Sequence, residues 1–284
     1  MSQSARIAPR EERFEGPGGV KLFGRSSKPE SSPRAILAIS PGFNSHSGQY
    51  QWVTDQFTAA GFSVYALDFR GRGKSDGPRF YVDDVKEYVG DLAALVKLAK
   101  SREPGLPVYV LAHSAGGVIA CTYALDHQNE IAGLICEDFA FQVPAPDFVL
   151  STIAALSRVA PHLGVLKLKN KDFSRDPKVV EVMNADPLIK NEVQPAKTLA
   201  ALWYADQRLK KEFPKLTLPV FILHGTADKV TKASGSQFFY DTAGSKDKTI
   251  KLYEGHYHDL LNDVGKEAVL GDIKGWLDKR VPAR

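Results

Sequence analysis

Short apolar segments rich in β-branched residues alternate with amphipathic segments along most of this 284-residue chain. The apolar segments show no alternation of polar and apolar side chains, which is typical of strands buried on both faces of a parallel sheet. We expect strands at 36–40, 64–68, 108–112, 131–136, 220–224 and 249–253, and a leading hairpin at 13–24. Helices are expected at 50–60, 82–100, 117–126, 234–242 and 264–279. This order predicts a doubly wound α/β fold, with a mostly parallel central sheet flanked by helices.

The segment 141–214 breaks this order. It contains several helical stretches and prolines at 144, 146, 161, 177, 187 and 195, but no convincing parallel strand. It is longer than a single crossover between parallel strands requires. We therefore expect a helical cap, or lid, at 141–214, inserted into a core domain formed by 1–140 and 215–284. A series of ordinary crossover helices is the alternative.

Composition excludes several classes of protein. The formal net charge of +4 is too small for this length to indicate nucleic-acid binding, and the basic stretch 167–171 is interpreted as a solvated face. The longest apolar-leaning segment, 148–160, is too short and too polar to span a bilayer. The N-terminus lacks the apolar stretch of a signal peptide, so a cytoplasmic location is expected. Cys121 and Cys136 could form one disulfide, but their apolar surroundings favour reduced core residues.

Ser114 lies where the predicted strand 108–112 turns directly into the predicted helix 117–126. A serine on a sharp strand-to-helix turn has the geometry of a nucleophile elbow, which exposes its hydroxyl above the carboxyl edge of the sheet. The usual pattern is Gly-x-Ser-x-Gly, of which this chain keeps only Gly116, because Ala112 stands at the first position. The position between strand and helix strengthens an otherwise weak motif and makes Ser114 the candidate nucleophile.

A serine hydroxyl needs a base, and the base needs an orienting acid. In this kind of fold the chain order is Ser, acid, His. Asp228 follows the predicted strand 220–224, and His258 follows the strand 249–253, so both lie at the carboxyl edge of the sheet. His256 is a weaker candidate for the base. Asp138, with Glu137 beside it, is a weaker candidate for the acid.

Backbone N–H groups commonly stabilise the negative oxygen that forms during acyl transfer. One donor should be the amide of Ala115, directly after the candidate nucleophile. The second is expected in the loop after the strand 36–40, where Pro41 cannot donate and Gly42 allows a close turn. The amide of Phe43 is therefore the candidate second donor.

Four segments resemble the monoacylglycerol lipase and lysophospholipase group of α/β-hydrolases. Residues 41–50 resemble the family's His-Gly oxyanion loop with His-Ser-Gly-x-Tyr, 68–77 its Asp-x-x-Gly-x-Gly-x-Ser-x-Gly loop, and 112–117 its Gly-His-Ser-Met-Gly-Gly. Residues 223–228 and 253–258 resemble its acid and base segments, and the match assigns the base to His258. The chain departs from the family pattern at Pro41, Ala112 and Ala115, and by the acidic pair at 137–138.

The resemblance implies the α/β-hydrolase fold and a serine esterase or lipase that acts on monoacylglycerol or similar single-chain acyl esters. It implies no metal, no organic cofactor and a mobile cap that forms an apolar acyl channel. Gly42, His113 and Asp138 are expected to line the substrate site. Beyond the small-molecule ester, at most a peripheral lipid-surface contact through the cap is expected. Lysophospholipids and small or xenobiotic esters are alternative substrates.

Other motifs are weaker. Residues 71–75 resemble the end of a phosphate-binding loop, but the glycine that the full pattern needs is replaced by Asp68. His256 and His258 lack partners at a recognised zinc-ligand spacing. A non-catalytic binding protein of the same fold is a further alternative, although it would be expected to lack part of the candidate triad.

Overall fold

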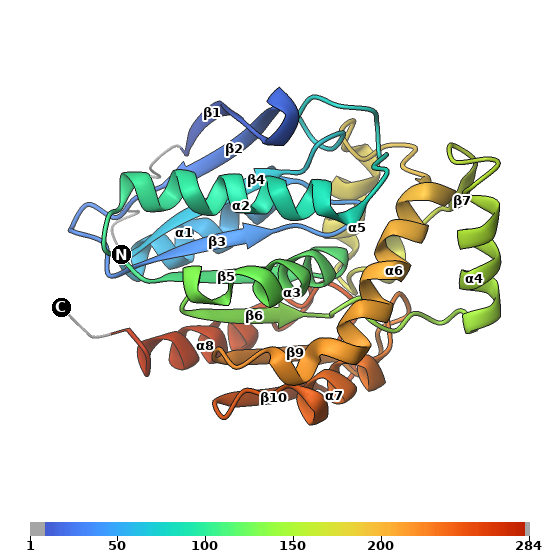
Figure 1. The fold of residues 1–284 in the computed structure, drawn as a ribbon. Helices are drawn as coiled ribbons and strands as arrows, with labels where there is room; N and C mark the ends of the chain where they lie inside the picture. The colour runs from blue at the N-terminus through green and yellow to red at the C-terminus, as the bar shows by residue number, and fades with distance from the viewer. Residues whose placement is uncertain (1–8, 282–284) are drawn as a thin grey trace.

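The computed structural model describes residues 9–281, so the first eight residues, on which part of the expected cytoplasmic location depends, lie outside the described residues. An eight-stranded sheet runs through the centre, in the order β1-β2-β4-β3-β5-β6-β9-β10 (Figure 1). β1 and β2 form an antiparallel pair, β2 is antiparallel to β4, and the other neighbours are parallel. The predicted hairpin and mostly parallel sheet are confirmed. The strands are β1 (Arg10–Glu15), β2 (Lys21–Ser27), β3 (Ala35–Ser40), β4 (Phe62–Asp68), β5 (Val108–His113), β6 (Gly133–Glu137), β9 (Val220–Gly225) and β10 (Lys248–Tyr253).

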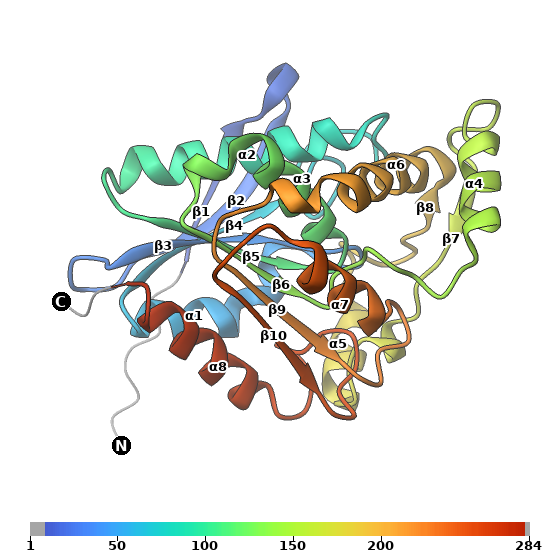
Figure 2. The same ribbon diagram turned by 60° about the horizontal axis from the view of Figure 1, so that its bottom comes forward.

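Helices cover both faces of this sheet, as Figure 2 shows from below. α1 (Gln51–Ala59) and α8 (Lys266–Asp278) pack on one face, where their apolar side chains join those of β3, β4 and β5 in one buried cluster. α2 (Val85–Arg102), α3 (Ala115–His127), α6 (Ala196–Glu212) and α7 (Ala233–Thr242) contribute to the cluster on the other face. The central strands β3 and β5 are buried along their whole length, which explains their unbroken apolar sequences.

Most of the segment 141–214 lies beyond the carboxyl ends of the strands (Figure 1). It contains α4 (Asp147–Leu156), α5 (Pro177–Ala185), α6 and a small antiparallel pair, β7 (Gly164–Leu166) with β8 (Gln194–Pro195). This pair was not predicted, because its strands are only three and two residues long. Leu202 and Leu209 of α6 belong to the main core, so this helix also covers the sheet. The division between core and cap at 141 and 214 stays a prediction.

Two further sequence expectations concern the membrane and the cysteines. Within the described residues, no helix is both long and apolar enough to cross a membrane. Cys121 of α3 and Cys136 of β6 are free and fully buried, with their Sγ atoms 3.8 Å apart. The interpretation of both cysteines as reduced core residues is therefore confirmed.

Candidate active site

Ser114 joins the end of β5 to the start of α3 in a strained turn. Its φ of 54° and ψ of −122° lie in a region that side-chain-bearing residues rarely adopt. The turn also needs space beside it, because a Cβ on Gly116 would come within 2.2 Å of the Ser40 carbonyl oxygen. The turn therefore has the strand-to-helix geometry expected of a nucleophile elbow, with Ser114 at the positive end of α3.

His258 and Asp228 approach Ser114 from two other strand ends. His258 Nε2 lies 2.8 Å from Ser114 Oγ, and His258 Nδ1 lies 2.8 Å from Asp228 Oδ2. Asp228 follows β9 and His258 follows β10, so the parallel sheet brings their loops to the same edge. Ser114 is 4% exposed, and the side chains of His258 and Asp228 are 0% and 1% exposed. This burial shields the hydrogen bonds from water. The structure thus brings the three predicted residues together.

Asp228 is held as a carboxylate by several donors. Burial by itself would raise its pKa, but His258 together with hydrogen bonds from His224 and Thr231 holds the pKa well below the usual range of an aspartate. Thr231 Oγ1 donates to Oδ2 at 2.5 Å, and the backbone N–H of Val230 donates to Oδ1 at 2.7 Å. An ionised, oriented carboxylate is what an imidazole base requires from its partner.

His113 supports the loop that carries His258. Its Nε2 lies 3.0 Å from the backbone carbonyl oxygen of His258, which can only accept, so Nε2 carries the proton. Burial lowers the pKa of His113 to about 4, which keeps the ring neutral at physiological pH. His256, the alternative base, instead has its Nδ1 3.7 Å from Asp263. The structure therefore pairs Ser114 with His258 and gives His113 a contact with the backbone of the same loop.

Asp138, the alternative acid, is fully buried behind Asp228. Its Oδ1 accepts a hydrogen bond from the Gly225 N–H at 2.9 Å and lies 3.8 Å from His224 Nε2. Burial and the nearby Asp228 charge raise its pKa well above the usual value, which disfavours the ionised form of this carboxyl group. Asp138 accepts from the Gly225 N–H, whereas the His258 ring contacts Asp228, so Asp138 is a poor candidate for the acid of the triad.

Glu137 is also fully buried. Its Oε1 accepts from the Leu261 N–H at 2.9 Å, and burial together with Asp259 raises its pKa well above the usual value. These contacts tie the end of β6 to the loop after His258. The contact of Glu137 with Leu261 is therefore structural and lies three residues beyond His258.

The spacing of Asp138, His224 and Asp228 is compatible with a metal ion, because one ligand atom of each lies within 4.8 Å of the others. Protein groups already use these atoms: the Asp228 Oδ2 accepts from His258 Nδ1 and lies 3.2 Å from His224 Nε2. A metal on Asp228 would compete with the His258 bond. This donor set therefore fits the hydrogen-bonded acid of a triad better than a metal site.

The expected oxyanion loop lies directly against the nucleophile. A Cβ on Gly42 would come within 2.8 Å of Ser114 Cβ and 3.1 Å of the His113 carbonyl oxygen, so only glycine allows this approach. Within residues 9–281, the backbone N–H groups of Phe43 and Ala115 donate to no protein acceptor. Two free donors on either side of a serine form the arrangement that a developing oxyanion requires.

Residues 31–265 match the family model described as serine aminopeptidase, S33. The chain belongs to this family of α/β-hydrolases. It is 35% identical to the monoacylglycerol lipase of Mycolicibacterium smegmatis, over 94% of this chain and 96% of that protein. It is 32% identical to human monoglyceride lipase, over 92% and 88% of the two chains.

The crystal structure of Paleococcus ferrophilus monoacylglycerol lipase is similar, with a TM-score of 0.81 and 29% identity over 90% of this chain and 98% of that one. The resemblance found in the sequence motifs is therefore confirmed across most of the chain. Because its relatives are lipases, this α/β-hydrolase is a carboxylic ester hydrolase.

Two groups of residues near the site of this hydrolase were not predicted from the sequence. The first is His224, whose Nε2 lies 3.2 Å from Asp228 Oδ2 and whose Nδ1 lies 2.8 Å from Ser236 Oγ. Glu192, from the segment 141–214, reaches the oxyanion loop. A histidine inside the otherwise apolar strand β9 was a usable signal, because a buried polar side chain needs a partner. Glu192 stands in a polar loop and gave no such signal.

Proposed function

We propose that this α/β-hydrolase cleaves monoacylglycerols and similar single-chain acyl esters with Ser114 as nucleophile, His258 as base and Asp228 as acid. The observation that carries the proposal is the unbroken chain of two 2.8 Å contacts, from Ser114 Oγ through the His258 ring to Asp228 Oδ2. This geometry supports a serine nucleophile activated by an oriented imidazole.

In the proposed mechanism, His258 Nε2 takes the Ser114 proton as Oγ attacks the ester carbonyl carbon. Asp228 stabilises the imidazolium that forms. The negative carbonyl oxygen is bound by the free N–H groups of Phe43 and Ala115. His258 then gives its proton to the leaving alcohol, and an acyl group stays on Ser114. Water, deprotonated by the same imidazole, releases the fatty acid and restores the enzyme.

The choice of substrate is supported by the relatives and by the surface of the segment 141–214. Proteins named monoacylglycerol and monoglyceride lipase match nearly the whole chain. Phe148, Val159 and Val182 of the segment are 71%, 82% and 65% exposed, and we propose that these apolar side chains make a peripheral contact with a lipid surface. We therefore propose that the segment acts as the cap over the acyl site.

Of the residues expected to line the substrate site, Gly42 has the best support, because it adjoins Ser114 directly. His113 and Asp138 are 1% and 0% exposed and contact the loops that hold the base and the acid. We propose that these two act on the substrate through those loops rather than by direct contact.

The first experiment measures hydrolysis of a p-nitrophenyl ester and labelling by a fluorophosphonate. Ser114→Ala should lose both, and retention of full activity would show that the nucleophile is wrong. Asp228→Asn should be severely impaired, while Asp138→Asn should lose much less, because the His258 ring contacts Asp228 and Asp138 instead accepts from the Gly225 N–H. An equal loss in the two variants would contradict the assignment of the acid.

A second experiment addresses the substrate with a panel of esters that includes monoacylglycerols of increasing chain length, a lysophospholipid and small aromatic esters. The proposal expects the highest kcat/KM on a monoacylglycerol. A clear preference for a lysophospholipid or a small ester would refute the substrate and leave the triad assignment intact.

A further inference from the structure

We infer that Glu192, carried by the segment 141–214, is a positioning residue for the oxyanion loop, so that this segment controls transition-state stabilisation as well as access. The inference rests on the proposed function. Phe43 is the candidate oxyanion donor, and the segment contacts the loop at the next residue, Asn44, as well as further along it. The backbone N–H of Asn44 donates to Glu192 Oε1 at 3.1 Å.

Asn44 has an unusual backbone that needs support. Its φ is 51°, in the left-handed region, although it carries a side chain. The Phe43 carbonyl and the Asn44 N–H belong to one planar peptide group, so the bond to Glu192 fixes the orientation of the backbone directly after the candidate donor. A second bond, from Asn44 Nδ2 to Asn170 Oδ1 at 2.9 Å, holds the side chain of the same residue.

Glu192 is itself held in place by buried partners. It is 3% exposed and accepts hydrogen bonds from Arg72 and, at 2.6 Å, from Gln194 Nε2. Arg72 is 2% exposed, and its guanidinium lies 4.1 Å from the centre of the Phe43 ring. Buried charges persist only when they are paired, so Arg72 and Glu192 stabilise each other while both contact the oxyanion loop.

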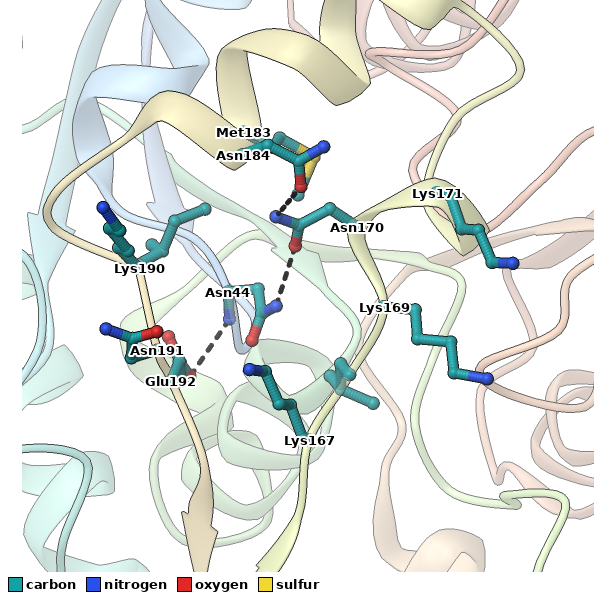
Figure 3. Close-up of a pocket in the computed structure, with 12 residues that line it drawn as sticks. Asn44, Lys167, Lys169, Asn170, Lys171, Met183, Asn184, Lys190, Asn191 and Glu192 are labelled. Carbon is teal, nitrogen blue, oxygen red and sulfur yellow. Dashed lines mark hydrogen bonds between the residues drawn. The ribbon is translucent and has the colours of Figure 1, made fainter.

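Figure 3 shows that Asn44 is held from two sides, by Glu192 from the loop before β8 and by Asn170 from a short 3-10 helix (Asn170–Asp172). Asn170 Nδ2 continues the chain to Asn184 Oδ1 at 3.0 Å. These residues form part of the wall of a cavity of about 570 Å³ beside the oxyanion loop. A displacement of the segment that withdraws Glu192 would release the Asn44 peptide, and with it the position of the Phe43 N–H.

The experiment compares Glu192→Ala with Glu192→Gln, which keeps an acceptor for the Asn44 N–H. Because an oxyanion donor acts mainly in the transition state, Glu192→Ala should lower kcat about tenfold or more on a short-chain ester, with KM changed less than about threefold. Glu192→Gln should keep most of kcat. A trifluoromethyl ketone, which adds to the serine and places an oxyanion in the same site, should bind Glu192→Ala more weakly in proportion to the loss of kcat.

Asp186→Asn is the matched control. Asp186 also lies in the segment and contacts the same loop, but through the side chain of His46 at 2.7 Å rather than through the Phe43–Asn44 peptide group. It should therefore change kcat and ketone affinity by less than about threefold. The inference is overturned if Glu192→Ala keeps wild-type kcat and ketone affinity, or if Asp186→Asn reproduces its losses, since the effect would then be a general loosening of the segment.

Glu192→Ala leaves Arg72 buried without its partner and could fail to fold. The double variant Arg72→Met with Glu192→Met removes both charges, a replacement that folded proteins often tolerate. It should show the same loss of kcat with wild-type circular dichroism, and wild-type kcat in this variant would also overturn the inference. Failure of the proposed function is distinguished separately, because Ser114→Ala would then keep activity.

Discussion

The His113 ring should make this protein sensitive to acid. Its pKa is lowered from 6.5 to about 4 because burial disfavours the charged imidazolium. Below pH 6.5 the unfolded chain binds a proton at this residue while the folded protein does not, so falling pH favours unfolding. Each pH unit in this range is worth about 1.4 kcal/mol, so the contribution of His113 to stability, fully present above pH 6.5, falls by about 3 kcal/mol near pH 4.

His113→Gln tests this value. Glutamine does not titrate, and its amide nitrogen can still donate toward the His258 carbonyl oxygen that accepts from His113 Nε2. Urea unfolding followed by circular dichroism at several pH values between 8 and 4.5 gives the free energy of unfolding of both proteins. As pH falls, the free energy of unfolding of the variant should rise relative to that of the wild type, and the total change in this difference should approach about 3 kcal/mol. Other titrating groups cancel because both proteins carry them.

A difference that does not change with pH would refute the reasoning. It would mean that the folded protein protonates His113 as easily as the unfolded chain does, and that its buried contact with the base loop does not control its charge. Activity at pH 8 is the accompanying control, since both side chains are neutral there and the loop of His258 should keep its position.

Three further predictions concern other buried contacts. Gly42→Ala should lower kcat about tenfold or more in the ester assay, because its Cβ would lie 2.8 Å from Ser114 Cβ and must displace the oxyanion loop; wild-type kcat would contradict this close approach. The raised pKa of Asp138 contributes stability to the wild type that is lost as pH rises, so Asp138→Asn should become more stable relative to wild type as pH rises from about 4, by at most about 1.4 kcal/mol per pH unit. Urea unfolding from pH 4 to 8 measures this difference, and a difference in the free energy of unfolding that does not change with pH would contradict it. Phe173→Ala should reduce the free energy of unfolding by about 3–5 kcal/mol, because the ring is 1% exposed and lies 5.0 Å from the His258 ring; a loss below about 1 kcal/mol in urea unfolding would show that the ring is not packed there.

Much of the fold could be predicted because its signals are local. The strands β3 and β5 are buried on both faces, so their sequences are apolar throughout and contrast with the helices around them. The strand-to-helix turn at Ser114 combines small residues with a buried strand, which identified it without any knowledge of its neighbours. The pair β7–β8 had no such signal, since strands of three and two residues, one of them ending in Pro195, have too little pattern.

The candidate site was predictable where chemistry and chain order were enough. Ser114, Asp228 and His258 each follow a strand of a parallel sheet, and the carboxyl ends of such strands share one edge. The choice between Asp228 and Asp138 needed more. Both follow buried strands, but only the arrangement of His224, Thr231 and the surrounding backbone shows which carboxylate stays ionised.

The sequence by itself determined the order of strands and helices, the strand-to-helix turn at Ser114 and the chain order of the candidate nucleophile, acid and base, because short-range patterning and turn chemistry specify them. Only the tertiary structure decided that Glu192 meets Asn44, 148 residues away in the chain, and that Ser114 and His258, 144 residues apart, come within hydrogen-bond distance. Such contacts depend on how whole elements pack. The sequence around a polar loop side chain does not indicate its distant partner, whereas the apolar residues along a buried strand indicate its burial.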